Sequence, residues 1–201
     1  YYRRTHNKIE RIQSVFPDSQ DVVLMTIDNV GNDYSLGSEF NLRYHITKGW
    51  NFNIMGDLYH YRVEGNLNDQ SFDRESFTWS TRVNNTFKFG SGWQIQWDGM
   101  YRSPTVSSQG RREGYFRSNL AVGKEFLDGK LNATLQIRDI FDTAKWENSS
   151  EGDGFTSYFY REMVSPVVML NLKLNLNNYK EQRGRPQNGG DYEGPEGGGG
   201  F

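Results

Sequence analysis

The sequence of 201 residues contains no cysteine, which excludes disulfide bonds and thiolate metal sites. It also contains no apolar run of the roughly 20 residues that a membrane-spanning helix requires. The net charge is only −2, from 23 basic and 25 acidic residues, so there is no electrostatic signature of nucleic-acid binding. A disulfide scaffold, a helical membrane anchor and a nucleic-acid-binding protein are therefore not expected.

Long stretches in which every second residue is apolar or small dominate the sequence. The clearest of these stretches extend from Tyr34 to Ile46, from Trp50 to Leu58, from Phe77 to Phe89, from Trp93 to Tyr101 and from Leu131 to Phe141. Alternation of this kind predicts β-strands with one apolar face, and strands of roughly 9–11 residues or more can cross a bilayer at a tilt. We therefore predict an all-β fold, an antiparallel transmembrane β-barrel, integral to the bacterial outer membrane.

The polar composition is compatible with a membrane barrel. Mean hydropathy is −0.82, but about half of each spanning strand faces the lumen and is polar. Aromatic residues make up 15% of the chain, and Trp50, Phe89 and Trp93 flank tight turns, as expected of aromatic girdles. The alternative is a soluble β-sandwich or a small lipocalin-like barrel with the apolar rows inside. An eight-stranded barrel has too little interior space for so many large aromatic side chains.

The pattern predicts about eight strands and two kinds of connection. The strands are expected at residues 1–13, 21–46, 50–64, 74–89, 93–103, 114–127, 130–141 and 154–177. Tight turns are expected at 47–49, 90–92 and 127–130, and long polar loops near 16–20, 65–74, 103–113 and 142–153. Short periplasmic turns and longer extracellular loops are typical of outer-membrane barrels. Pro166 predicts a bulge in the last strand or its division into two short segments.

The chain divides into a barrel segment, residues 1–177, and a Gly-rich tail, residues 178–201, which we expect to be disordered. Residues 1–11 lack the apolar core of a signal peptide, so we expect a fragment that begins in the middle of a barrel. Outer-membrane barrels commonly end on an aromatic residue that the assembly machinery recognises. Phe201 is the candidate for that signal, although the tail separates it from the last strand.

The run Phe126–Leu135, followed by Ile137–Thr143 with its Asp-Ile-Phe-Asp-Thr sequence, resembles the next-to-last hairpin of TonB-dependent receptors and of the outer-membrane β-barrel family related to them. The resemblance implies a barrel of about 22 strands with an N-terminal plug. It also implies uptake of a chelate, vitamin or glycan, driven through TonB. This chain would supply the C-terminal part, with the plug and the TonB-contacting segment outside it. The alternative is a self-contained structural or adhesive barrel of about eight strands.

Candidate site residues fall into two groups. Charged residues on the polar rows are expected to face the lumen and to contact the plug or a solute: Glu39, Arg43 and Arg82. Loop residues are the expected ligand contacts, because binding residues concentrate on loops held by a rigid scaffold: Arg111, Arg112, Trp146, Phe155 and Tyr158.

Other chemistry is not expected. The three histidines, His6, His45 and His60, are scattered without metal-ligand spacing, and no serine, histidine and acid are arranged for nucleophilic catalysis. We predict no enzymatic activity, metal or cofactor. The expected partners are outer-membrane lipid, the plug and TonB of a receptor, and the barrel-assembly machinery.

Overall fold

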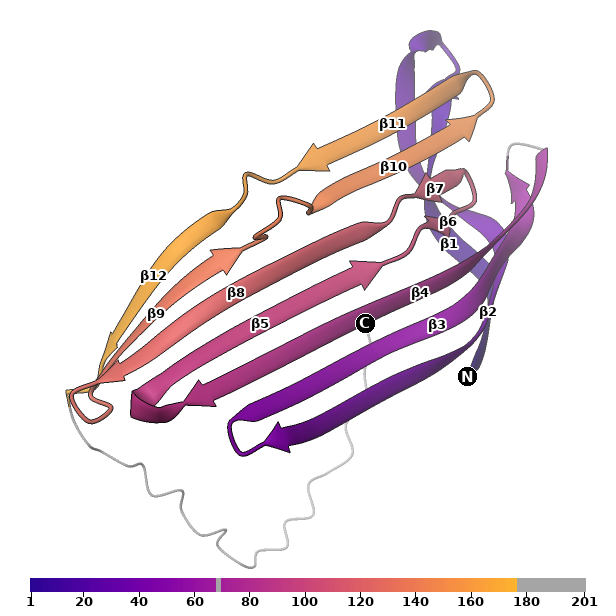
Figure 1. Ribbon diagram of the computed structural model, residues 1–201. Coiled ribbons are helices and arrows are strands. Elements are labelled where there is room, and N and C mark those ends of the chain that lie inside the picture. Colours follow the sequence, from indigo (N-terminus) through magenta and orange to yellow (C-terminus); the bar gives the residue numbers. More distant parts are fainter. Residues whose placement is uncertain (68–69, 177–201) are drawn as a thin grey trace, which may run out of the picture.

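The computed structural model describes residues 1–67 and 70–176, apart from the side chain of Gln20. The main sheet is antiparallel and has eight strands in the order β1-β2-β3-β4-β5-β8-β9-β12 (Figure 1). Their bounds are β1 Tyr2–Phe16, β2 Ser19–Thr47, β3 Trp50–Leu67, β4 Gln70–Phe89, β5 Trp93–Arg102, β8 Tyr115–Phe126, β9 Leu131–Arg138 and β12 Val167–Leu174. No helix among the described residues is long and apolar enough to cross a membrane. The predicted tail, residues 178–201 with Phe201, lies outside the described residues.

A second, small sheet contains four strands in the order β11-β10-β7-β6. Their bounds are β6 Thr105–Val106, β7 Gly110–Arg112, β10 Lys145–Gly152 and β11 Phe155–Glu162. The small sheet lies at one end of the main sheet, opposite the end that carries the tight turns (Figure 1).

The three predicted tight turns are confirmed. β2 and β3 are joined by Lys48–Gly49, and β4 and β5 by the 3-10 turn η1, Gly90–Gly92. β8 and β9 are joined by a turn in which Leu127, Asp128 and Gly129 all have positive φ. Glycine adopts this conformation without steric cost, which accounts for its place in the second and third turns.

The predicted long loops at the opposite end are wrong. Only Pro17 and Asp18 separate β1 from β2. β3 extends as far as Leu67, and β4 already begins at Gln70. The loops expected at 103–113 and 142–153 contain β6, β7 and β10. These segments are polar on both faces, so they show no alternation, although their backbone groups still pair with neighbouring strands.

The last predicted strand, 154–177, is two strands in different sheets. β11 ends at Glu162 and β12 begins at Val167, with Pro166 between them. The segment of β9 and β10 is interrupted at the same level. β9 pairs with β12 on one side of this break, and β10 pairs with β11 on the other. β9–β10 and β11–β12 are therefore the two arms of one long hairpin, and both arms are broken at the same place.

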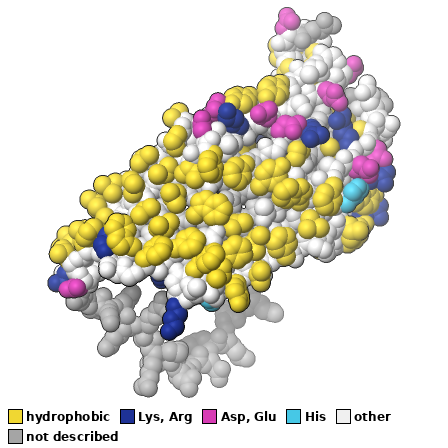
Figure 2. All heavy atoms as spheres, in the orientation of Figure 1, with side chains coloured by type: hydrophobic (Ala, Val, Ile, Leu, Met, Phe, Trp, Pro, Cys, Tyr) yellow, Lys and Arg dark blue, Asp and Glu magenta, His cyan; other side chains and the backbone are white. Residues whose placement is uncertain are grey.

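The register gives the main sheet one apolar and one polar face. Leu42 is opposite Ile54, which is opposite Val83, whereas Arg43 is opposite Asn53. Exposed apolar side chains cover the face seen in Figure 2, and charged side chains gather at the end near the small sheet. The apolar band ends at one row across β2, β3 and β4: Leu36, His60 and Phe77. The next row is polar and charged: Tyr34, Arg62 and Glu75.

The main sheet is open. Its outer strands, β1 and β12, lie on opposite sides, and within residues 1–67 and 70–176 they do not pair with each other (Figure 1). β1 accompanies β2 only from the pair Tyr2 and Leu36 toward the charged end. Residues 38–46 of β2, within the apolar band, pair with β3 on one side and with no described strand on the other.

Candidate ligand-binding cleft

The small sheet folds over the polar face of the main sheet at its charged end. Thr78 Oγ1 donates a hydrogen bond to Thr105 Oγ1 at 3.2 Å, and the Val106 amide donates to Ser76 Oγ at 3.4 Å. Ser76 and Thr78 belong to the polar rows of β4, opposite Tyr61 and Tyr59 of β3. These contacts join β6 to the inner side of the sheet, away from the apolar band.

Two further contacts attach the β6–β7 turn to β1. Gln109 exchanges hydrogen bonds with the backbone of Gln13, and both are 2.7 Å long. Ser108 donates to Glu10 Oε2 through its amide at 3.2 Å and its hydroxyl at 2.5 Å. Ser108 and Gln109 are both buried, so these bonds satisfy polar groups that are removed from water.

Lys8, which is also on β1, connects the carboxylate of Glu10 to β2 and β3 of the main sheet. Its ammonium lies 2.8 Å from Glu10 and 3.1 Å from buried Asp33, and it donates to the hydroxyl of Tyr61. Burial of the ammonium would lower the pKa of Lys8, but the bonds to Glu10, Tyr61 and Asp33 raise it above its usual value. Burial by itself would raise the pKa of Glu10. The hydrogen bonds from Lys8 and Ser108 have the larger combined effect and hold the pKa of Glu10 below its usual value.

A cleft of about 650 Å³ lies between the small sheet and the polar face. Its lining is polar for the most part, and strands of both sheets contribute five cationic and three aromatic residues to it: Arg3, Lys8, Arg11, Arg111, Arg112, Tyr59, Tyr61 and Phe159. Glu10 is the one acidic residue among the lining residues, and it is already bonded to Lys8 and Ser108. The cleft therefore carries an excess of positive charge.

The predicted loop residues only partly meet in this cleft. Arg111 and Arg112 line it, whereas Trp146, Phe155 and Tyr158 are not among its lining residues. Trp146 stacks on Tyr115, with ring centroids 4.9 Å apart, and so helps to hold β10 against β8. Tyr158 is exposed on the other face of the β10–β11 hairpin. Their role in ligand contact stays a prediction.

Comparison with known proteins identifies the family. The sequence matches the outer membrane protein beta-barrel family over residues 1–175, which is nearly all of the described chain. The chain belongs to this family. It is an integral outer-membrane protein. No curated protein and no solved structure gives a significant match.

Membership of the outer-membrane β-barrel family assigns the two faces of the main sheet. The apolar face contacts lipid and the polar face contacts the lumen, because only this arrangement matches each surface to its surroundings. Leu42, Phe87 and Leu172 belong to the apolar rows, as expected from the sequence. The charged row of Arg62 and Glu75 lies beyond the band, and the small sheet and the cleft lie at this end, opposite the tight turns. We expect this end to be extracellular, because short turns are typically periplasmic in such barrels.

The three predicted lumen residues lie on the polar face but not in one place. Glu39 and Arg82 line a second, smaller groove of about 470 Å³ with Asp57, Met100 and other residues of β2 to β5. Arg82 Nη2 donates to Met100 Sδ at 3.2 Å. Arg43 is on the same face but is not among the residues of this groove. Contact of these three residues with a plug or a solute stays a prediction.

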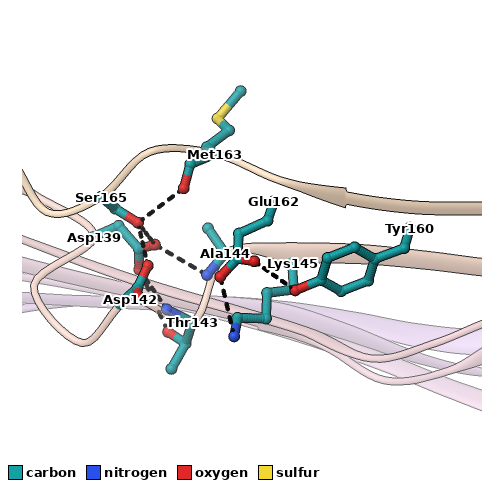
Figure 3. A network of polar contacts seen from close by, with 9 residues as sticks. All are labelled: Asp139, Asp142, Thr143, Ala144, Lys145, Tyr160, Glu162, Met163 and Ser165. Carbon is teal, nitrogen blue, oxygen red and sulfur yellow. Dashed lines mark hydrogen bonds and ion pairs between the residues drawn. The ribbon is translucent and has the colours of Figure 1, made fainter.

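The Asp-Ile-Phe-Asp-Thr segment forms the break between β9 and β10 (Figure 3). Asp139 accepts hydrogen bonds from the amides of Thr143 at 3.2 Å and Ala144 at 3.0 Å. Ser165, on the other arm, lies with its hydroxyl 2.9 Å from Asp139 Oδ2 and 2.6 Å from Asp142 Oδ1. This network fixes the change of direction that carries β10 and β11 to β7 and over the cleft.

Sequence reasoning missed several cleft residues. Arg3, Tyr59, Tyr61 and Phe159 were not singled out, because they come from three separate strands that only the fold brings together. One signal was present: Tyr59 and Tyr61 are large aromatic residues on rows that are otherwise polar. An aromatic side chain on a lumen-facing row has no lipid to contact, so it indicates packing or binding inside.

Proposed function

We propose that this chain is the C-terminal part of a TonB-dependent receptor-like transporter that takes up a chelate, vitamin or glycan. The observation that carries the proposal is the open main sheet. Residues 38–46 of β2 and the outer edge of β12 have backbone groups without a partner strand among the described residues. Since lipid provides no hydrogen bonds, both edges need partner strands, and we propose that further strands provide them. A barrel of about 22 strands would supply them.

The contents of the polar face support a large barrel. The interior of an eight-stranded barrel holds little more than its own side chains or one small ligand. Here the polar face carries both the extracellular cleft and the separate groove around Arg82. In a 22-stranded transporter the lumen is wide and is closed by a plug, and the groove of Glu39 and Arg82 would then be a contact surface for that plug.

The cleft supports a role in ligand capture. We assign it to the extracellular end, because short turns like those at the opposite end are typically periplasmic. A network of hydrogen bonds attaches its small sheet to β1 and β4. Binding sites commonly lie on segments that a rigid scaffold positions in this way. The proposal assigns no catalytic step to the chain, and its partners are outer-membrane lipid, the plug, TonB and the barrel-assembly machinery.

An uptake assay tests the proposal. Cells producing the full-length protein are compared with cells lacking it for uptake of labelled ferric citrate, cobalamin and maltooligosaccharides. An energised transporter should accumulate at least one of these compounds, and an uncoupler should abolish accumulation while binding at the cell surface persists.

A passive barrel gives different results. Entry that continues after addition of the uncoupler, or no difference between the two strains for any of the compounds, would contradict the transport proposal. The competing function is then the self-contained structural or adhesive barrel.

A further inference from the structure

We propose that the extracellular cleft binds an anionic ligand, one that carries carboxylate, phosphate or sulfate groups on a body with a flat apolar or sugar face. This inference rests on the proposed function, because it names the ligand class of the same cleft. It makes neutral ligands such as neutral glycans poor candidates.

The first argument is the lack of acidic partners for two arginines of the cleft, Arg3 and Arg112. Lys8 is paired with Glu10 and Asp33, and Arg111 lies 3.1 Å from Glu113. In the part of the chain that the structure describes, Arg3 and Arg112 have no carboxylate within salt-bridge distance. Both are exposed, so their guanidinium groups are accessible to a solute in the cleft.

The second argument is that arginines from both sheets line the same cleft. Arg3 comes from β1 of the main sheet, and Arg112 comes from β7 of the small sheet. Guanidinium groups bind carboxylate and phosphate through paired hydrogen bonds, so two such groups without carboxylate partners are suited to an oxyanion.

Other extracellular charges on the chain behave differently. Arg62 lies 2.6 Å from Asp73, and Arg74 lies 2.8 Å from Glu151. In these two pairs, a carboxylate neutralises the charge of an arginine outside the cleft. Arg3 and Arg112 lack this compensation, which distinguishes the cleft from an ordinary solvated wall.

The third argument concerns the rest of the lining. Tyr59, Tyr61 and Phe159 provide aromatic surface beside the cations. The volume of about 650 Å³ falls within the range of small-molecule sites. Aromatic walls with a few charged groups position a ligand that has both a flat face and an anionic group.

Calorimetric titration of the full-length protein in detergent tests the proposal. The anionic probes are trigalacturonate, which carries carboxylates on sugars, and pyrophosphate, which carries charge alone. Maltotriose is the neutral control. The double substitution Arg3→Gln and Arg112→Gln should weaken binding of the anionic probes by about ten-fold or more. The matched control is Arg62→Gln, which removes one extracellular guanidinium from the outer face and should leave binding unchanged.

The outcomes separate the ligand class from transport. Binding of either anionic probe that the double substitution weakens supports the proposal, and Arg3→Lys with Arg112→Lys should retain part of it. Stronger binding of trigalacturonate than of pyrophosphate assigns the aromatic walls to a sugar. Binding of neither anionic probe, or equal binding by the double variant, overturns the ligand class. If energised uptake of a neutral compound is observed in that case, the transport proposal is supported while the anionic ligand class is rejected.

Discussion

Ser165 Oγ lies 2.9 Å from Oδ2 of Asp139, and this contact joins the two arms of one hairpin where both arms change sheets. β9 and β12 belong to the main sheet on one side of the contact, and β10 and β11 belong to the small sheet on the other (Figure 1). The Asp139 network therefore holds the two arms together at the point where β10 and β11 leave the main sheet for the small sheet.

Removal of the Asp139 carboxylate should free the β10–β11 hairpin. Asp139→Ala leaves the amides of Thr143 and Ala144 without their acceptor, at a cost of about 1–3 kcal/mol. Spin labels at Thr156 and Ser71 should then give a broader distribution of distances by pulsed electron paramagnetic resonance.

The control for this experiment is Asp153→Ala, in the turn between β10 and β11. It removes the same charge from the same hairpin without touching the break between the arms. An unchanged distribution in Asp139→Ala would show that other contacts position the small sheet.

The orientation of the main sheet predicts unequal effects at neighbouring positions. Leu42→Arg places a charge on the lipid face near the middle of the apolar band, at an expected cost of about 2–4 kcal/mol. Asn41→Arg places the same charge on the polar face and should cost far less. The measurement is the free energy of unfolding of the full-length protein in bilayers, and equal losses would reject the orientation.

The contact between β1 and the small sheet should weaken in acid. The pKa of Glu10 is below its usual value of 4.5 in the folded protein, so its contribution to stability is complete above that value. It is lost as the pH falls through the lower, folded pKa. Amide exchange at Ser108, corrected for its intrinsic pH dependence, should accelerate in that window.

Glu10→Gln should remove this pH dependence. It should also cost about 1–2 kcal/mol of local stability at neutral pH, because the bonds from Lys8 and Ser108 lose a charged acceptor. An acceleration in acid that is the same in the variant would assign the transition to another group.

The membrane wall could be predicted from the sequence and the cleft could not. Apolar residues such as Leu36, Leu42 and Tyr44 alternate with polar ones because lipid lies on one side of the strand. The sequence pattern therefore reveals this asymmetry directly. Beyond the band, both faces of a strand meet water or protein. β10 with its sequence Lys-Trp-Glu-Asn-Ser-Ser-Glu-Gly is the example: nothing in its pattern requires a strand.

The site residues show the same limit. The sequence predicts Arg111 and Arg112 as ligand contacts on a loop, and they line the cleft. Arg3 could not be associated with them, because about a hundred residues separate it from β7 and only the packing of Ser108 and Gln109 on β1 brings them together. The break at Asp139 is also a tertiary effect, although its sequence was recognisable as a motif.

Disulfide cross-linking across the open edges tests the central claim most directly, because the chain has no cysteine of its own. In the full-length protein in outer membranes, Arg43→Cys on β2 is combined in turn with Met169→Cys, Asn171→Cys or Lys173→Cys on β12. The control combines Arg43→Cys with Asn53→Cys, which face each other across β2 and β3. If further strands complete a larger barrel, the control pair cross-links and no pair with β12 does. Efficient cross-linking of Arg43→Cys to any of the three β12 positions would mean that the eight strands close on themselves, and would contradict the account.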